Sequence, residues 1–192
     1  MSIKVKRMVK VSVDAFQVGD VIKFKLTNGT KVQAMAMQQE EDGMIFCLVS
    51  CLPGREFLMN KTNTNKGGYE ASDLRKKLNG EILNLFPAEL THMMAPFENG
   101  DLLRIPTEKE IFGENCYGEY ENQVKQWKPM KQRKNRMAFD SAKGESLQWY
   151  WLMNKVREST IYFSFADRAG CAGFDSAFIS YGVRPVFKIK NF

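Results

Sequence analysis

Apolar and polar residues alternate along much of the first forty residues, a pattern typical of β-strands with one buried face. The alternation predicts strands over 3–13, 21–27 and 30–37. Asn28-Gly29 separates the last two strands and is the pair most typical of a tight hairpin turn, in which both residues take positive φ. Residues 44–52 are almost continuously apolar, which predicts a central strand buried on both faces. Residues 1–52 are therefore predicted to form a β-meander.

Helical spacing of apolar residues begins further on, at Leu74, Leu78, Ile82 and Leu85. Ser72 stands at the N-cap position and Pro87 ends the run, so we expect a helix over 72–85. A shorter helix is predicted over 87–94, because proline is tolerated at the first helical position. Thr107 and Glu110 match a capping box that would start another short helix over 107–112.

Periodicity is lost between 113 and 144, so this segment is predicted to be irregular. Strands are predicted again over 147–153, 160–166 and 182–189. Alternation in the first of these places Trp149 and Trp151 on one face and Tyr150 and Leu152 on the other, and one face must be core. Pro185 lacks an N–H, so the last strand either lies at a sheet edge or turns its proline away from the ladder.

The composition is that of an ordinary globular chain. With 192 residues, 44% of them apolar, one domain over 1–192 can bury a sizeable core. No signal peptide and no apolar run of membrane-spanning length is present, so we expect a soluble protein made in the cytoplasm, with no membrane partner. The net charge is +6, and the segment 125–136 carries six basic residues and no acid: Lys125, Lys128, Lys131, Arg133, Lys134 and Arg136. Such a run either neutralises phosphates or forms a solvated face.

Chemistry-bearing clusters are sparse. His92 is the only histidine and stands in a predicted helix, and the paired carboxylates at 40–42, 119 and 121 fall in turns and polar loops. The four cysteines form no C-x-x-C pair, so no zinc set is expected; free thiols are favoured, while a Cys116–Cys171 bridge stays open. No nucleotide-binding or metalloprotease motif is found. The sequence therefore predicts no catalytic residue, no metal and no cofactor.

Three motifs together resemble a family of bacterial and phage domains of unknown function. They are the helix Ser72-Asp73-Leu74-Arg75 with Leu78-Asn79, the strand Tyr150-Trp151-Leu152 and the terminal Gly182-Val183-Arg184-Pro185. The family is similar to a branch of the C-type-lectin-like fold shared with formylglycine-generating enzymes and phage receptor-binding determinants. The resemblance implies an α+β fold in which the N- and C-terminal strands meet, two helices flank the sheet and long loops display a binding surface. It also implies framework roles for the motif residues Ser72, Arg75, Asn79, Trp151, Gly182, Arg184 and Pro185.

The chain departs from this family pattern at points that bear on function. Met153-Asn154 stands where many members continue with Arg-Ser. The triplets of calcium-dependent sugar-binding lectins and the close cysteine pair of formylglycine-generating enzymes are missing. Neither a calcium–glycan site nor oxidase activity is therefore predicted.

Three interpretations of the function follow. The first is a non-catalytic binding or display module, associated with a phage or prophage as a virion or tail-type structural protein, that recognises a protein or cell-surface ligand through loops. The second is an enzyme of the same fold whose chemistry is not located. The third, resting only on the basic run, is a nucleic-acid-associated phage protein. Virion proteins and a second copy of the chain are further candidate partners.

The predicted binding residues stand in two segments expected to be loops, 153–160 and 166–180. Loops on a rigid scaffold are where binding residues concentrate. The candidates combine charged, amide and aromatic side chains: Asn154, Lys155, Arg157, Arg168, Phe174 and Asp175. Trp127 and Phe174 are the aromatic residues in polar or glycine-rich surroundings, where an aromatic side chain either anchors a ligand or partner or packs against the fold.

Overall fold

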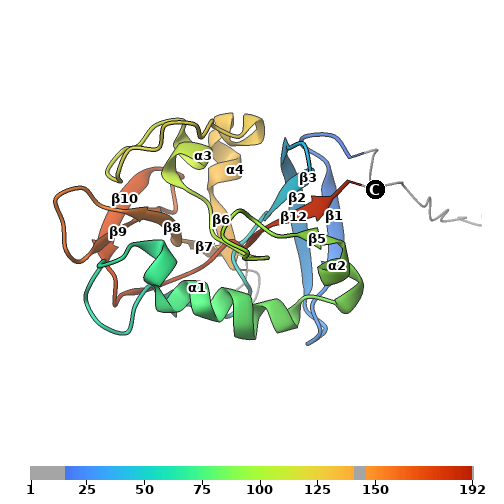
Figure 1. Ribbon diagram of the computed structural model, residues 1–192, viewed down its shortest axis with the longest axis horizontal. Coiled ribbons are helices and arrows are strands. Elements are labelled where there is room, and N and C mark those ends of the chain that lie inside the picture. The colour runs from blue at the N-terminus through green and yellow to red at the C-terminus, as the bar shows by residue number, and fades with distance from the viewer. Residues whose placement is uncertain (1–15, 141–145, 192) are drawn as a thin grey trace, which may run out of the picture.

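A computed structural model describes residues 16–140 and 146–191 and shows an α+β fold, as predicted. A five-stranded sheet occupies one half of the molecule and a three-stranded sheet the other. The helical segment that begins at residue 73 runs along one side of both sheets, and two short helices lie on the opposite side (Figure 1). The strand predicted over 3–13 lies outside the described residues.

The predicted meander is confirmed for its described strands. They are β1 (Val21–Lys25), β2 (Lys31–Gln39) and β3 (Gly43–Leu48), paired antiparallel in that order. The turn at Asn28-Gly29 differs from the prediction, because only Gly29 has positive φ, at 84°. Leu26 accepts from the Gly29 N–H at 2.8 Å and donates to Thr30 at 2.8 Å, so a four-residue turn is followed by a bulge at Gly29.

The C-terminal strand returns to this sheet, as predicted. β12 (Val186–Lys190) lies between β3 and the two-residue β5 (Met94–Ala95), antiparallel to both. Every residue of β3 is buried, which confirms the central strand. Pro185 immediately precedes β12 and contributes only its carbonyl oxygen, which accepts from Leu48 N–H at 3.0 Å. Within the described strands β12 does not neighbour β1, so the contact between first and last strands is not seen there.

The second sheet consists of β8 (Tyr150–Lys155), β9 (Tyr162–Ala166) and β10 (Ala172–Ser176), in the order β10-β9-β8. The single strand predicted over 147–153 is wrong. The chain forms β7 (Ser146–Gln148), which pairs with β6 (Ala138–Asp140), and then starts β8 after Trp149. A further two-stranded pair joins β4 (Phe57–Leu58) to β11 (Ser180–Tyr181).

The helices begin where the capping residues predict, but the main one changes its winding. Helix α1 (Asp73–Lys77) continues into a π-helical turn, Leu78–Ile82, and a 3-10 turn, Leu83–Leu85. Helix α2 (Ala88–Met93) follows Pro87, and α3 (Glu108–Phe112) has the predicted capping box of Thr107 with Glu110. The segment predicted to be irregular contains a 3-10 turn, Lys128–Lys131, and helix α4 (Arg133–Arg136) in addition to β6.

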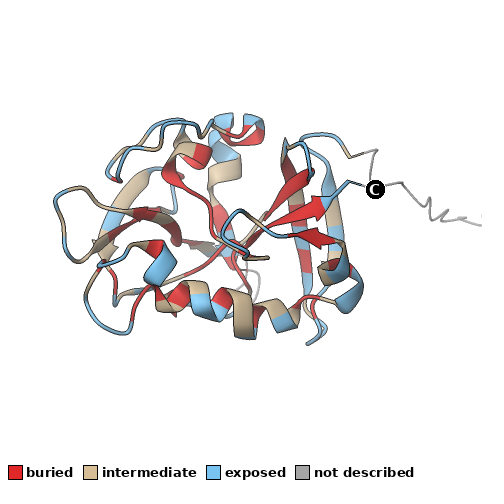
Figure 2. Ribbon diagram, in the orientation of Figure 1, coloured by how far each residue is buried: buried red, intermediate tan, exposed pale blue. Residues whose placement is uncertain are grey.

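Both faces of β8 are core, which extends the sequence prediction. Trp151 packs into the larger apolar cluster, while Tyr150 and Leu152 belong to a second cluster on the other face. Trp127 lies in this second cluster and is 1% exposed, so of the two roles left open for it, ligand anchor or core packing, the structure shows packing. Figure 2 shows the buried residues concentrated along β3, β8 and β12, where the two halves of the fold meet.

Four of the residues with expected framework roles form polar contacts between or at the ends of these elements. Ser72 caps α1 by accepting from Arg75 N–H at 3.1 Å. The Arg75 guanidinium forms a 2.6 Å ion pair with Asp101. The Asn79 side chain accepts from Leu102 and Leu103 N–H groups, each at 3.0 Å. Trp151 donates its indole N–H to the Phe57 carbonyl at 2.8 Å. These contacts tie the helical segment and β8 to the chain around them.

Arg184 is 1% exposed and lies against both Cys47 and Tyr150. No ion pair of Arg184 is found among the described residues. The guanidinium donates instead to the carbonyl oxygens of Leu48 at 2.9 Å and Asn135 at 3.0 Å, and to the Tyr150 hydroxyl at 3.2 Å. Gly182 leaves room beside this cluster, since an added Cβ would lie 2.6 Å from Cys51 Sγ.

Two neutral acids beside Arg184 make stability sensitive to alkaline pH. Burial raises the pKa of the Cys51 thiol from 9.0 to about 12 and that of the Tyr150 hydroxyl from 10.0 to about 12. Above pH 9 the unfolded chain releases these protons while the folded chain keeps them, so the free energy of unfolding falls as pH rises from 9 to 12. Urea unfolding at several pH values is expected to show this decline, and a shallower one in Cys51→Ala; equal slopes would contradict it.

Candidate binding surface

The structure places the predicted binding residues on and around the three-stranded sheet, but on different faces of it. The expectation that 153–160 and 166–180 are loops is wrong at Met153–Lys155, which belongs to β8, and at 172–176, which is β10. Asn154 is 8% exposed. Its amide oxygen accepts from Glu108 N–H at 2.7 Å, and its amide nitrogen donates to Glu121 at 3.0 Å. Asn154 therefore holds neighbouring segments together and offers little surface to a ligand.

Lys155 and Arg157 contact the segment 114–121, which runs beside the end of β8. Lys155 forms a 2.9 Å ion pair with Glu119. Arg157 donates to the Cys116 carbonyl at 3.1 Å, and its guanidinium lies 4.7 Å from the centre of the Tyr120 ring. Both side chains therefore help to position this segment.

Phe174 lies at the middle of β10 and is 42% exposed. Its ring meets Tyr117 edge-on, with 4.9 Å between ring centres, and Tyr162 at 5.3 Å. Tyr117 comes from the segment 114–121 and Tyr162 from β9, so three separate parts of the chain bring these rings together. Of the two aromatic residues proposed from the sequence, Phe174 is the one at the surface.

Asp175 and Arg168 lie apart from this group. Successive side chains of a strand point to opposite faces, so Asp175 projects away from Phe174. Asp175 accepts from the Tyr181 hydroxyl at 2.6 Å. Burial, and then the hydrogen bond to Asp175, raise the pKa of Tyr181. Arg168 is exposed and lies 5.9 Å from the Trp149 ring. The six predicted residues therefore do not form one site.

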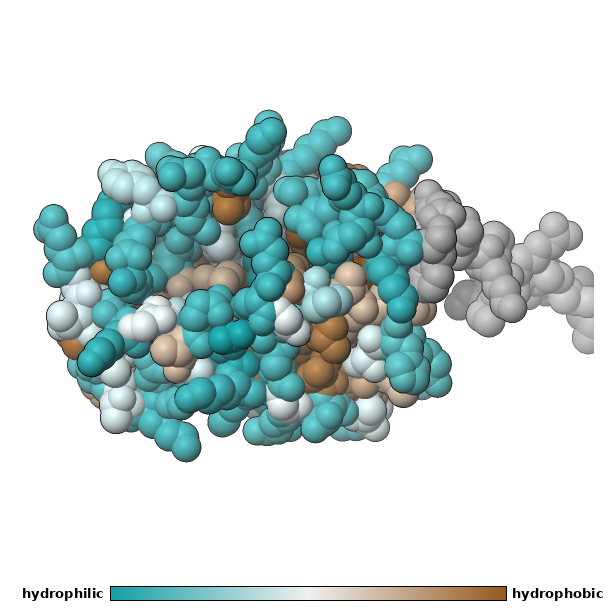
Figure 3. All heavy atoms as spheres, in the orientation of Figure 1, coloured by the Kyte–Doolittle hydropathy of each residue, from teal (hydrophilic) through white to brown (hydrophobic). Residues whose placement is uncertain are grey.

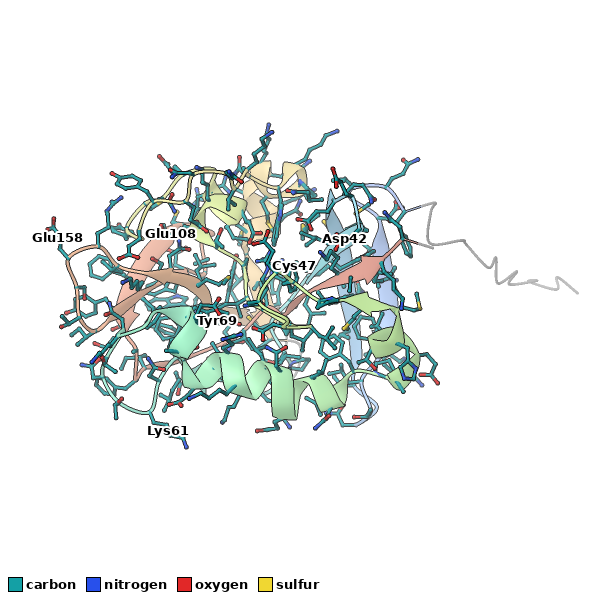
Figure 4. All side chains as sticks on the ribbon, in the orientation of Figure 1. Asp42, Cys47, Lys61, Tyr69, Glu108 and Glu158 are labelled. Atoms are coloured by element: carbon teal, nitrogen blue, oxygen red, sulfur yellow. The ribbon has the colours of Figure 1, made fainter. Side chains whose placement is uncertain are left out.

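The surface that the structure does assemble is an aromatic patch in which Phe174 contacts Tyr117 and Tyr162, and Arg157 links these rings to Tyr120. Tyr120 is 77% exposed and Tyr117 is 37% exposed. The sequence reasoning missed both tyrosines, because they stand in the segment without periodicity. The signal available was their spacing, two tyrosines around Gly118 in an otherwise polar stretch. Glu158, at the tip of the loop beyond Arg157, projects outward at this end of the molecule (Figure 4).

A buried carboxylate fixes the backbone of this patch. Glu108, at the start of α3, is 0% exposed. Its carboxylate accepts from the N–H groups of Tyr117 at 3.1 Å and Gly118 at 2.9 Å. Gly118 also bridges to Val156 beyond the end of β8. The tyrosine-bearing segment is thus held in place before any ligand binds. In Figure 4, Glu108 lies at the side of the molecule that carries α3.

The basic run 125–136 mixes exposed basic residues with buried apolar ones. Trp127, Pro129 and Met130 are buried within it. The Arg133 side chain donates to the Ala169 carbonyl at 2.7 Å, and that of Arg136 to the Met130 carbonyl at 2.8 Å. Arg133 and the four lysines of the run are exposed: Lys125, Lys128, Lys131 and Lys134.

A groove of about 700 Å³ separates the turn 40–42 from the segment 97–104. Its two most buried cations are already paired: Arg104 with Glu110 at 2.5 Å and Lys188 with Asp42 at 2.6 Å. Figure 3 shows that the face containing this groove is largely hydrophilic. Among the described residues, no group of three or more His, Cys, Asp and Glu side chains is placed to hold a metal ion. His92 is exposed on α2, and the four cysteines, including Cys116 and Cys171, are free thiols.

No protein-family model, curated protein or solved structure matches this chain. Within the part of the chain that the structure describes, no helix is both long enough and apolar enough to span a membrane.

Proposed function

We propose that the protein is a non-catalytic binding module that recognises a protein or cell-surface ligand through the aromatic patch. The observation that carries the proposal is that Tyr117, Tyr120 and Phe174 are each more than one-third exposed and are joined by the Tyr117–Phe174 ring contact and by Arg157, which contacts both tyrosines. On the resemblance of the sequence motifs, the proposal includes a C-type-lectin-like fold and a place in a phage or prophage, as a virion or tail-type protein.

The physical support is that this surface is apolar and already rigid. Large exposed aromatic side chains contribute area to an interface at a small cost in side-chain entropy, and Tyr and Arg are enriched among residues that dominate binding energy. The contacts of Glu108 and Arg157 hold the segment 114–121 in the free protein. Binding therefore does not have to order that segment first.

A nucleic-acid-associated role is the second candidate, and the four exposed lysines of 125–134 favour it. The two candidates predict different salt dependence. Neutralising several phosphates makes affinity fall steeply with ionic strength, whereas aromatic contacts respond weakly. Titrating a single-stranded oligonucleotide and intact bacterial cells at two salt concentrations separates the two candidates.

Tyr120→Ser and Phe174→Ser are expected to weaken binding to intact cells of candidate host bacteria by about 10-fold or more, because each removes an exposed anchor. Phe139→Ser is the matched control, since Phe139 is 40% exposed but lies on β6, outside the patch. A fluorescently labelled protein and flow cytometry give the readout. The proposal is wrong if both patch variants bind as well as the wild type while replacing the four lysines by alanine abolishes binding.

A further inference from the structure

The outer edge of β10 is an unprotected strand edge. β10 pairs with β9 on one side only and ends the sheet order β10-β9-β8 (Figure 1). Figure 2 shows β10 in the colours of intermediate and exposed residues, unlike β8. The strand Ala172–Ser176 contains no lysine, no proline and no bulge against β9, which are common devices that keep an edge from pairing with another strand.

The hydrogen-bond register shows which backbone groups face outward. Just beyond the two ends of the paired segment, Asp167 N–H donates to the Cys171 carbonyl at 2.8 Å and Ala177 N–H donates to the Ile161 carbonyl at 2.9 Å. Hydrogen-bonded and non-bonded positions alternate in an antiparallel pair, so Gly173 and Asp175 bond to β9. Ala172, Phe174 and Ser176 point their N–H and C=O groups away from it.

The outward N–H and C=O groups of Ser176 form hydrogen bonds with residues close by in the chain. Its N–H donates to the Asp175 carboxylate at 2.7 Å and its carbonyl accepts from Ile179 at 3.0 Å. The N–H and C=O groups of Ala172 and Phe174 have no hydrogen-bond partner among the described residues. These four groups form one short edge, with Gly173 at its centre.

We propose that a second copy of this chain binds this edge, β10 against β10, antiparallel about a two-fold axis at Gly173. Ala172 of each copy then faces Phe174 of the other, and the four open groups of each copy are satisfied by four intermolecular hydrogen bonds. The inference does not rest on the proposed function, because its hydrogen bonds come from the backbone of β10; Phe174 is the one patch residue that both surfaces share.

Side-chain chemistry favours a second copy over an unrelated peptide. The two glycines meet at the axis, where the strands approach closest and a side chain would crowd the pair. Phe174 covers Ala172 of the other copy. Asp175 lies opposite Cys171, so no like charges face each other. The Arg133 guanidinium lies 3.3 Å from Cys171 Sγ, which brings a cation next to the incoming Asp175 carboxylate, twice by symmetry.

The dimer is tested first by a cross-link. Asp175→Cys places a thiol opposite the native, exposed Cys171 of the other copy, at a Cα separation of about 4.5 Å for a non-bonded pair. That separation lies within the disulfide range, whereas residues 171 and 175 of one extended strand are about 13 Å apart. Mild oxidation of Asp175→Cys is expected to give a covalent dimer on a non-reducing gel. Asp175→Cys in a Cys171→Ser background, and Phe178→Cys, are expected to stay monomeric on the same gel.

The second test measures the dimer dissociation constant by sedimentation equilibrium. Ala172→Pro removes an outward N–H without a loss of pairing to β9, and it keeps the Phe174 ring. We expect this variant, and Arg133→Glu, to raise the dimer dissociation constant by about 10-fold or more. Far-UV circular dichroism confirms that each variant is folded. A wild-type chain that is monomeric up to sub-millimolar concentration would overturn the inference. So would a dimer that neither variant weakens. Cell binding that is lost in Phe174→Ser but kept in Ala172→Pro would support the proposed function whether or not the chain forms this dimer.

Discussion

Arg184→Ala is expected to lower the free energy of unfolding by about 3–5 kcal/mol, which makes it one of the two most damaging changes we predict. The substitution leaves the carbonyls of Leu48 and Asn135 and the Tyr150 hydroxyl without their buried donor. Each unsatisfied buried acceptor costs about 1–3 kcal/mol, and the emptied volume adds to the loss. Urea unfolding monitored by tryptophan fluorescence measures the change.

Arg168→Ala is the matched control for this prediction. Arg168 is exposed and its described contact is a 5.9 Å approach to the Trp149 ring, so the expected loss is below about 1 kcal/mol. Small and equal shifts in the two variants would show that Arg184 does not hold β3, β8 and α4 together.

The strands of the five-stranded sheet were predictable because burial on one or both faces leaves a pattern in the sequence. Continuous apolar residues identified β3 as central, and the apolar run after Pro185 identified β12. The winding of the main helix was not predictable in the same way. Its apolar spacing fits an ordinary helix, and Leu74, Leu78 and Ile82 are all buried although the winding changes to a π-helical turn at Leu78–Ile82.

The strand β10 was missed because its residues carry no burial signal. Ala172 and Gly173 are small, and Phe174 points outward. An edge strand is specified by its neighbour, here β9, and not by its own apolar pattern. The partners of Arg184 were not predictable either. An arginine in an apolar segment indicates burial, but the segment cannot show that its partners are carbonyl oxygens distant in sequence.

The candidate site was only partly predictable. Phe174 was found because an aromatic residue among small and polar ones is conspicuous. Tyr117 and Tyr120 join it through contacts of residues far apart in the chain, above all the hydrogen bonds from Tyr117 and Gly118 to Glu108. Local patterns contain no information on such contacts, and the capping box identified Thr107 and Glu110 but not the role of Glu108.

Glu110→Ala is expected to lower the free energy of unfolding by about 3–5 kcal/mol, because it leaves the Arg104 guanidinium buried without its counter-ion. The two side chains are 7% and 11% exposed and form two hydrogen bonds, at 2.5 and 2.8 Å. The Glu110 carboxylate also accepts from Thr107 N–H at 2.9 Å, so the capping box of α3 is lost too. Thermal and urea unfolding measure the loss.

Two comparisons decide whether the buried charge is the cause. Glu81→Ala breaks an ion pair of similar length, 2.7 Å to Arg55, but the side chains are 55% and 37% exposed. An exposed pair of this kind contributes about 1 kcal/mol or less. The double variant Arg104→Met/Glu110→Leu removes both charges and keeps the volume, so it should regain most of the stability that Glu110→Ala loses. If the double variant is as unstable as Glu110→Ala, the damage comes from the lost cap and packing of α3 rather than from an uncompensated Arg104.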